Sequence, residues 1–230
     1  MIRLMAFDLD GTLIDSRRDL ADSANELLAS YGAPPLAHEE VIGMVGEGAR
    51  VLIGRVLKAA RATAAPIDEA LGRFLDIYDR RLVDHTRPYP GIVETLRALA
   101  PDCRLAVLTN KPRRPAVEIL QHFGVMELFV EVIGGDSPLP RKPDPANLLA
   151  LCQQTDIRPG EALIVGDSWV DVETGRRAGA QVCFVEWGFG QPPAQGLHEG
   201  EWRIAHPQEL LEIAGLREGD ESARLLDQQF

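Results

Sequence analysis

The sequence predicts a doubly wound parallel α/β sheet that is interrupted, after its first strand, by a block of helices. Two observations support this fold class. Short apolar runs alternate with helix-like stretches through the second half of the chain, which is typical of buried parallel strands joined by helical crossovers. Residues 15–86, in contrast, contain no convincing strand, so we expect the inserted helices there.

The expected strands are five apolar runs, at residues 4–7, 105–108, 129–133, 162–165 and 182–185. Helices are expected between the later runs, at residues 92–99, 115–123, 145–154 and 170–178. Ligands of such sheets bind at the carboxyl ends of the strands. Polar residues that directly follow an apolar run are therefore the first candidates for a functional site.

The expected helical block carries apolar residues at helical spacing in three stretches, each of them one stripe of an amphipathic helix. The stretches lie at residues 20–31, 49–60 and 71–82. We expect Ser16 and Asp19 to cap the first helix. The prediction is a core of residues 1–14 and 87–230 with an inserted helical domain of residues 15–86. That domain lies beside the end of the first strand, where it can exclude water and contact a substrate.

The composition limits the classes of ligand. The chain has 230 residues, 45% hydrophobic and 26% charged, which suits one or two compact domains with a sizeable core. A formal net charge of -11 and a pI of about 4.9 argue against a general attraction to nucleic acid or to an anionic membrane. An anionic ligand must be held by local features such as a metal ion or a few cations.

Three cysteines, Cys103, Cys152 and Cys183, are odd in number and widely spaced among apolar neighbours, which predicts buried thiols in a reducing compartment. The first strand begins almost at Met1, which leaves no room for a signal peptide, and no apolar run reaches the length of a membrane span. We therefore expect a cytoplasmic protein, either a monomer or a homodimer. The polar residues 217–230 predict a frayed helix or a tail.

Asp8 and Asp10 directly follow the first apolar run. Side chains alternate along an extended segment, so both carboxylates project to one side while Leu9 projects to the other. Two like charges this close raise one pKa unless a cation or a division of labour relieves them. The pair therefore indicates metal binding, acid/base chemistry or both, and Gly11 permits a tight turn after it.

A second pair of acids, Asp167 and Asp171, follows the apolar run at residues 162–165. Their spacing puts both on one face if a helix begins there. Together with Asp8 and Asp10 they supply up to four carboxylates from two strand ends, and hard oxygen ligands of this kind select Mg²⁺. Asp171 has a second interpretation, as a first-turn acid stabilised by the helix dipole.

Two further segments supply what a phosphate group needs. Thr109 and Asn110 follow the second run of the core and offer a hydroxyl, an amide and backbone N–H groups to phosphate oxygens. Lys142 precedes a helix start between two prolines, where its charge can offset both a carboxylate and a phosphate.

In this order the segments resemble the haloacid dehalogenase superfamily of phosphatases. The matching motifs are DLDGT at residues 8–12, TN at 109–110, KPDP at 142–145 and GDSWVD at 166–171. The resemblance covers nearly the whole chain, with residues 15–86 in the place of the helical cap that this branch inserts after its first motif.

The resemblance implies a role for each motif residue. Asp8 is the expected nucleophile, which forms an aspartyl phosphate, and Asp10 the general acid and then the general base. The Asp8 carboxylate, the Asp10 backbone carbonyl and Asp167 are expected to hold Mg²⁺.

The remaining motif residues are expected to bind the substrate or to orient other groups. Thr109 and Lys142 are expected to hold the transferring group, with Asn110 assisting. Asp171 is expected to orient a metal-bound water or Lys142.

Softer matches point to the phosphoglycolate phosphatases within this superfamily. They are LTNKP at residues 108–112, VIGGD at 132–136, RKPDP at 141–145, WGFG at 187–190 and the glycine-rich GEGAR at 46–50. Phosphoglycolate, a small phosphorylated metabolite, also carries a carboxylate, so a second cation is expected outside the phosphate site. Arg50 is the candidate, because a guanidinium binds carboxylate in a bidentate manner. The alternative is that Arg50 opens the next helix and points to water.

Several other functions remain open or are disfavoured. A sugar-phosphate phosphatase, a pyrophosphatase or a phosphohexomutase of the same fold shares the core residues and differs only in the cap. A dehalogenase does not need the second acid, Asp10. A phosphonate hydrolase needs a cap lysine, and Lys58, the one lysine at residues 15–86, falls in an amphipathic helix. The helical insertion and the DLDGT spacing argue against a non-catalytic receiver domain that accepts a phosphoryl group.

Overall fold

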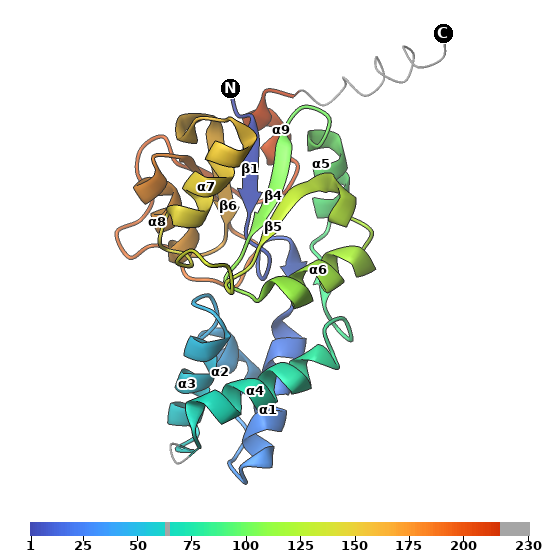
Figure 1. The fold of residues 1–230 in the computed structure, drawn as a ribbon, viewed down its shortest axis with the longest axis vertical. Helices are drawn as coiled ribbons and strands as arrows, with labels where there is room; N and C mark the ends of the chain where they lie inside the picture. The colour runs from blue at the N-terminus through green and yellow to red at the C-terminus, as the bar shows by residue number, and fades with distance from the viewer. Residues whose placement is uncertain (63–64, 217–230) are drawn as a thin grey trace.

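The computed structural model describes residues 1–62 and 65–216. Figure 1 shows a sheet with helices on both sides and a separate group of helices below it, at the end to which the arrow of β1 points. The tail expected at residues 217–230 lies outside the described residues. Within the described part of the chain, no helix is long and apolar enough to cross a membrane.

Six strands form one sheet in the order β5-β4-β1-β6-β7-β8, and every neighbouring pair is parallel. The strands are β1 (Leu4–Phe7), β4 (Arg104–Leu108), β5 (Phe129–Ile133), β6 (Ala162–Gly166), β7 (Gln181–Val185) and β8 (Trp202–Ile204). The five expected strands are confirmed. Strand β8 was not predicted, because two of its three residues are exposed and leave no apolar run.

Helices cover both faces of this sheet, which confirms the doubly wound fold class. They are α5 (Ile92–Leu99), α6 (Arg113–His122), α7 (Ala146–Thr155), α8 (Trp169–Ala178) and α9 (Glu209–Ala214). Figure 1 shows α7 and α8 on one side and α5 and α6 on the other. Successive residues of β1 serve the two sides in turn: Met5 and Phe7 join one buried cluster, and Leu4 and Ala6 the other.

The strand order places β1 between β4 and β6, at the point where the chain changes direction of winding. After β1 the chain builds β4 and β5 on one side, and then β6, β7 and β8 on the other. Ligand sites of open α/β sheets form at such a switch point, beyond the carboxyl ends of the strands. The residues that follow β1, β4 and β6 therefore face one common space.

The insertion contains α1 (Arg17–Ser30), α2 (His38–Ile42), α3 (Ala49–Ala59) and α4 (Ile67–Asp79). Helix α1 packs against α4 and α2, and α3 packs against α4. The chain leaves the core through β2 (Ile14–Asp15) and returns through β3 (Arg87–Pro88), and these two strands pair antiparallel. Strands this short give no apolar run, so they were not predicted from the sequence.

Ser16 stands at the N-cap of α1 and Asp19 in its first turn, as expected, but the expected side-chain capping is wrong. The Ser16 side chain makes no capping hydrogen bond, and its hydroxyl donates instead to Asp10 Oδ1 at 2.6 Å. Asp19 is fully buried and accepts hydrogen bonds from the backbone N–H groups of His85 and Thr86 and from the Thr86 hydroxyl, at 2.7 to 3.1 Å. Asp19 thus ties the beginning of the insertion to its end, because both of its oxygens face the returning chain.

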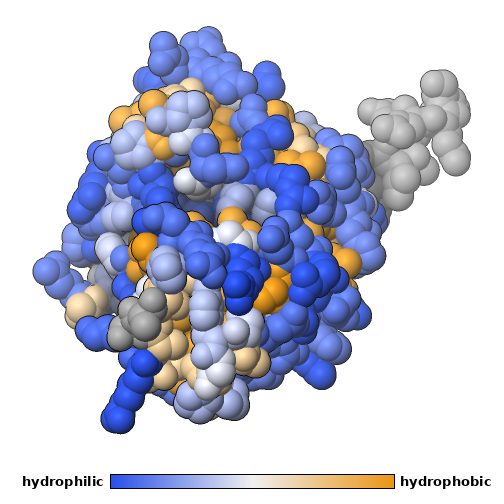
Figure 2. Space-filling view, turned by 60° about the horizontal axis from the view of Figure 1, so that its bottom comes forward, coloured by the Kyte–Doolittle hydropathy of each residue, from blue (hydrophilic) through white to orange (hydrophobic). Residues whose placement is uncertain are grey.

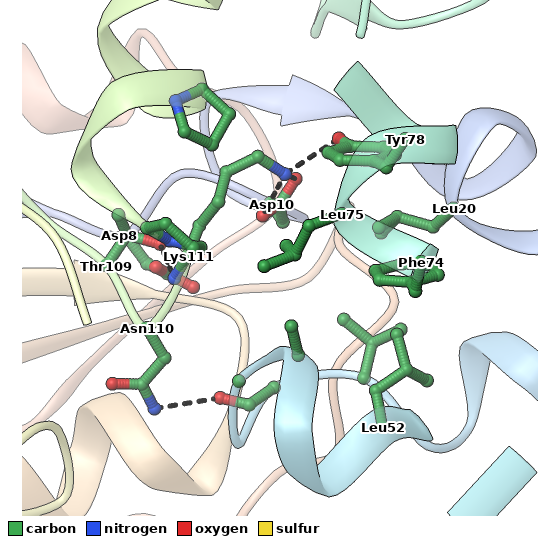
Figure 3. A pocket seen from close by; sticks show the side chains of 16 residues that line it. Asp8, Asp10, Leu20, Leu52, Phe74, Leu75, Tyr78, Thr109, Asn110 and Lys111 are labelled. Atoms are coloured by element: carbon green, nitrogen blue, oxygen red, sulfur yellow. Dashed lines mark hydrogen bonds and ion pairs between the residues drawn. The ribbon is translucent and has the colours of Figure 1, made fainter. Parts of the chain in front are cut away.

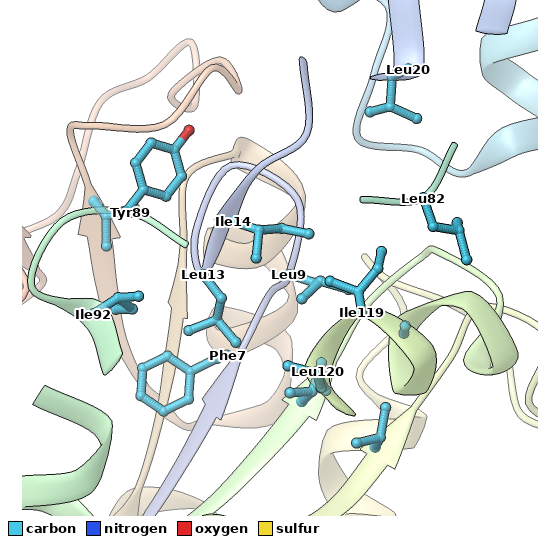
Figure 4. Packing of buried hydrophobic residues seen from close by; sticks show 14 of the residues in the cluster. Phe7, Leu9, Leu13, Ile14, Leu20, Leu82, Tyr89, Ile92, Ile119 and Leu120 are labelled. Atoms are coloured by element: carbon cyan, nitrogen blue, oxygen red, sulfur yellow. The ribbon is translucent and has the colours of Figure 1, made fainter. Parts of the chain in front are cut away.

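The turn after β1 is held by buried apolar side chains and by hydrogen bonds to the Leu9 carbonyl. Leu9, Leu13 and Ile14 are buried in the same cluster as Phe7 (Figure 4), and the Leu9 carbonyl accepts hydrogen bonds from the amides of Leu13 and Ile14. Gly11 has a φ of 91°, and a Cβ there would lie 2.0 Å from a carboxylate oxygen of Asp167. Position 11 therefore requires glycine, because the positive φ is unfavourable for other residues and a Cβ would overlap Asp167.

The face seen in Figure 2 is largely hydrophilic, with small and separate hydrophobic areas. Scattered apolar side chains are normal on a protein surface and need no partner.

Candidate active site

A pocket lies between the carboxyl ends of β1 and β4 and the inserted helices α1, α3 and α4 (Figure 3). Polar side chains of the core form one wall: Asp8, Asp10, Thr109, Asn110 and Lys111. Mostly apolar side chains of the insertion face them, among them Leu20, Leu52, Phe74, Leu75 and Tyr78. In this pocket, polar side chains of the core thus face apolar side chains of the insertion, which exclude water from them.

Asp8 is paired with a buried lysine. Lys142 Nζ lies 2.9 Å from Asp8 Oδ1 and 2.6 Å from Asp171 Oδ1. Burial alone would lower the pKa of Lys142, but the attraction of Asp171 and Asp8 outweighs it and the pKa is raised, so the ammonium stays charged. Burial raises the pKa of Asp8 to about 6, a rise that Lys142 limits and Asp171 adds to.

Asp10 is held by groups of its own. Lys111 Nζ donates to both carboxylate oxygens of Asp10 at 3.0 Å and to the Tyr78 hydroxyl at 2.7 Å (Figure 3). The Ser16 hydroxyl adds its hydrogen bond to Asp10 Oδ1. The like-charge problem of the two neighbouring acids is therefore solved by two lysines, one for each carboxylate.

Asp8, Asp167 and Asp171 each offer a carboxylate oxygen within 4.8 Å of the others. Asp171 is fully engaged, because its Oδ1 accepts from Lys142 and its Oδ2 from the hydroxyl and amide of Ser168. Within the described part of the chain, Asp167 accepts two hydrogen bonds, both at Oδ2, from the amides of Phe189 and Gly190. Oδ1 of Asp167 and the second oxygen of Asp8 are thus the oxygens that can face a cation.

The charges in this group of acids fit a metal ion, because three carboxylates share one lysine. Burial, then repulsion from Asp8 and Asp171, raises the pKa of Asp167 to about 8 even though two amides donate to the carboxylate. Lys142 is already shared by Asp8 and Asp171. A bound divalent cation would relieve the remaining repulsion, and the oxygen-only donor set fits a hard cation.

Thr109 and Asn110 follow β4 and reach the pocket, but their contacts differ. The Thr109 hydroxyl accepts from the Lys111 amide at 3.2 Å and lines the pocket. The Asn110 side-chain amide donates to the carbonyls of Gly46 and Lys142, both at 3.0 Å. Asn110 therefore joins a loop of the insertion to the lysine segment of the core, and its Oδ1 is buried without a hydrogen-bond partner.

The structure does not bring Arg50 to the pocket. Its guanidinium pairs with Asp68 at 2.6 Å and is about half exposed. The glycine-rich loop before it does line the pocket, through Gly46 and Gly48. The alternative interpretation of Arg50, at the start of a helix and turned to water, thus describes its position in α3.

Three residues of the site were not predicted from the sequence, namely Lys111, Tyr78 and Ser16. Lys111 directly follows Thr109 and Asn110, two candidate residues at a strand end, so its charge next to that strand end was the available signal. Tyr78 looked like one more apolar position of an amphipathic helix. Ser16 looked like a helix cap, and only the folded turn brings its hydroxyl to Asp10.

The fold and the site define the class: a doubly wound α/β protein with a candidate catalytic centre of buried lysine–carboxylate pairs at its switch point, beneath a helical insertion. The comparison with protein-family models identifies the family. The family model for the haloacid dehalogenase-like hydrolases matches residues 5–185. This chain belongs to that family.

Relatives and solved structures agree with this assignment. The chain is 39% identical over 218 residues to a phosphoglycolate phosphatase of Haemophilus influenzae, covering 92% of this chain and 97% of the relative. It is 38% identical over 194 residues to the phosphoglycolate phosphatase of Psychrobacter arcticus, covering 81% and 84%. A crystal structure described as a predicted phosphoglycolate phosphatase from Haemophilus somnus superposes with a TM-score of 0.86 at 35% identity, covering 92% and 97%.

Two of the alternative functions lose support. The family model is that of a hydrolase, which disfavours a receiver domain that only accepts a phosphoryl group. Lys58 is exposed on α3 and is not among the residues that line the pocket, so the structure gives no support to a phosphonate hydrolase that uses a cap lysine.

Proposed function

We propose that this protein is a Mg²⁺-dependent phosphatase that hydrolyses 2-phosphoglycolate to glycolate and phosphate through an aspartyl phosphate on Asp8. The observation that carries the proposal is the division of the two neighbouring acids. Asp8 is held by Lys142 and Asp10 by Lys111, so the two carboxylates have different partners and are free to take different roles.

In the first step, a carboxylate oxygen of Asp8 forms a bond to phosphorus while the bond from phosphorus to the ester oxygen breaks. Asp10 enters this step protonated and donates that proton to the leaving oxygen, and glycolate departs. In the second step Asp10 takes a proton from water, the water oxygen attacks phosphorus, and the bond to Asp8 breaks. Phosphate leaves, and both acids return to their starting states.

Two further residues hold the transferring group in this proposal, and a third positions the backbone around it. Lys142, which is buried next to Asp8, balances the charge of the phosphoryl oxygens, and the Thr109 hydroxyl donates to one of them. Asn110 acts indirectly: its side-chain amide donates hydrogen bonds to the backbone carbonyls of Lys142 and Gly46 and so positions both segments.

The carboxylates of Asp8 and Asp167 and the backbone carbonyl of Asp10 would hold Mg²⁺. When bound, the ion neutralises charge on the phosphoryl oxygens and on the nucleophile. The raised pKa of Asp167 supports the proposal, since this buried carboxylate has no lysine of its own. Asp171 orients Lys142.

The relatives and the pocket support the choice of substrate. Proteins that are 38% to 39% identical over most of their length carry the name phosphoglycolate phosphatase. The inserted domain of residues 15–86 acts as a cap in this proposal, and its side chains close the pocket over the reactive acids. A lysine in the same pocket suits a substrate with a second negative group.

The cysteines support a reducing compartment, since Cys103, Cys152 and Cys183 are free and buried. We propose a cytoplasmic enzyme that acts on a small phosphorylated metabolite as a monomer or a homodimer. Nucleic acid and membrane lipid are not partners in this proposal, because the net charge is -11.

Phosphate release from a panel of small phosphate esters, with and without Mg²⁺, tests the proposed function. The panel contains phosphoglycolate, hexose phosphates, pyrophosphate and p-nitrophenyl phosphate. We expect the highest kcat/KM for phosphoglycolate and no turnover after removal of divalent cations. A higher kcat/KM for a hexose phosphate or for pyrophosphate would assign a different member of the family, and isomerised sugar phosphate without release of phosphate would indicate a mutase.

A further inference from the structure

The pocket contains a positively charged side chain, that of Lys111, to which the proposed mechanism gives no contact with the substrate. Of the described residues that line the pocket, Lys111 alone has a positively charged side chain, and that side chain is only 5% exposed. Lys142 is turned to Asp8 and Asp171. The second cation that a carboxylate-bearing phosphate ester needs is therefore present, but not at Arg50.

We propose that Lys111 determines specificity by binding the carboxylate of phosphoglycolate. The inference rests on the proposed function, and the position of Asp10 supplies the geometry. Asp10 must touch the ester oxygen in order to protonate it, and one methylene group separates that oxygen from the substrate carboxylate. Lys111 Nζ is 3.0 Å from both oxygens of Asp10. A carboxylate attached so close to the ester oxygen falls within reach of the same ammonium.

The ammonium can change partner without releasing Asp10. A lysine ammonium has three N–H donors, and here two of them point to Asp10 and one to the Tyr78 hydroxyl. Ser16 holds Asp10 independently at 2.6 Å. One donor can therefore turn from Asp10 to the substrate carboxylate, while Ser16 and the second donor keep the acid in place.

The surroundings strengthen this contact and fix its position. Lys111 Nζ also lies 4.4 Å from the centre of the Tyr78 ring, and Phe74 stacks on that ring at 5.9 Å. Charged hydrogen bonds are stronger where water is excluded. Because Tyr78 belongs to α4, the Lys111 ammonium is held between the core and the insertion. A phosphate ester without a carboxylate cannot form an ion pair with it.

The test compares two substrates that differ in the distal group. Phosphoglycolate has a carboxylate, and 2-hydroxyethyl phosphate has an uncharged alcohol at the same place with a similar leaving oxygen. The variant Lys111→Gln removes the charge but keeps N–H donors on the side chain, and Lys111→Met repeats the comparison if the Gln variant does not fold. Arg50→Gln is the matched control, since it loses the same charge outside the pocket.

We expect Lys111→Gln to reduce the preference in kcat/KM for phosphoglycolate over 2-hydroxyethyl phosphate by about tenfold or more, chiefly through KM. Lys111→Arg should restore most of the preference, and Arg50→Gln should leave it unchanged. If wild type prefers phosphoglycolate and the Lys111 variants keep that preference, the inference is wrong and the proposed function stands. If wild type shows no preference between the two esters, both are wrong.

Discussion

Lys142 Nζ lies 2.9 Å from Asp8 Oδ1, and the two residues come from distant parts of the chain. The lysine is 3% exposed and also contacts Asp171 at 2.6 Å. A charge this deeply buried is stable only while its partners are present. The pair therefore serves the nucleophile and the stability of the fold at once.

Lys142→Met should lower the free energy of unfolding by about 3 kcal/mol in the absence of Mg²⁺, because it leaves buried carboxylates without their cation. Urea unfolding measures this change. Arg141→Met is the control, since Arg141 is exposed and its loss should cost no more than about 0.5 kcal/mol. Equal effects of the two variants would contradict the structural role of Lys142.

Asp10→Asn should slow hydrolysis most for esters with poor leaving groups. We expect kcat for phosphoglycolate to fall by about 10² to 10⁴, the usual contribution of a general acid or base. Formation of the aspartyl phosphate from p-nitrophenyl phosphate should fall far less, because p-nitrophenolate leaves without a proton. Stopped-flow detection of p-nitrophenolate separates this step from later turnover. The same loss with both leaving groups would mean that Asp10 is not the acid.

Asp167→Asn should remove the response of the protein to Mg²⁺ and stabilise it when no metal is bound. The pKa of Asp167 is raised by burial and by Asp8, so the charged form costs free energy until a cation arrives. At about a hundred times its Kd, Mg²⁺ should stabilise wild type by about 2.7 kcal/mol and the variant by little. Thermal unfolding with and without Mg²⁺, with the exposed Asp76→Asn as control, measures both effects. A variant that still gains stability from Mg²⁺ would place the ion elsewhere.

The core could be predicted because its signals are local. Buried parallel strands read as apolar runs, and the acids of the site follow those runs directly, as Asp8 and Asp167 do. Since the carboxyl ends of the strands meet at one edge, the sequence predicted which residues come together there. The paired strands β2 and β3 have no such signal because they are too short, and β8 has none because two of its three residues are exposed.

The pocket side of the insertion could not be predicted in the same way. Helical periodicity shows that Arg50 and Tyr78 lie on helices, but not which helix face meets the core. That choice depends on how the helices pack, for example on Asp19 holding the returning chain. Arg50 consequently faces water and pairs with Asp68, while Tyr78 receives a hydrogen bond from Lys111.

The thiols should be unreactive in the folded protein. Burial raises the pKa of Cys103, Cys152 and Cys183, so less thiolate is present at a given pH, and the thiolate is the nucleophile. At about pH 8 a thiol reagent such as Ellman's reagent should modify the native protein slowly and all three cysteines after denaturation. Rapid modification of a native cysteine would contradict its buried position.

The central claim is that Asp8 receives the phosphoryl group, and trapping that group tests it most directly. The Asp10→Asn variant is suited to this measurement, because p-nitrophenyl phosphate can phosphorylate it while the missing base slows hydrolysis of the intermediate. After acid quench, intact-mass and peptide analysis should find one phosphoryl group on Asp8, and none when Asp8→Asn is added. A phosphoryl group on another residue, or turnover that survives Asp8→Asn, would contradict the account.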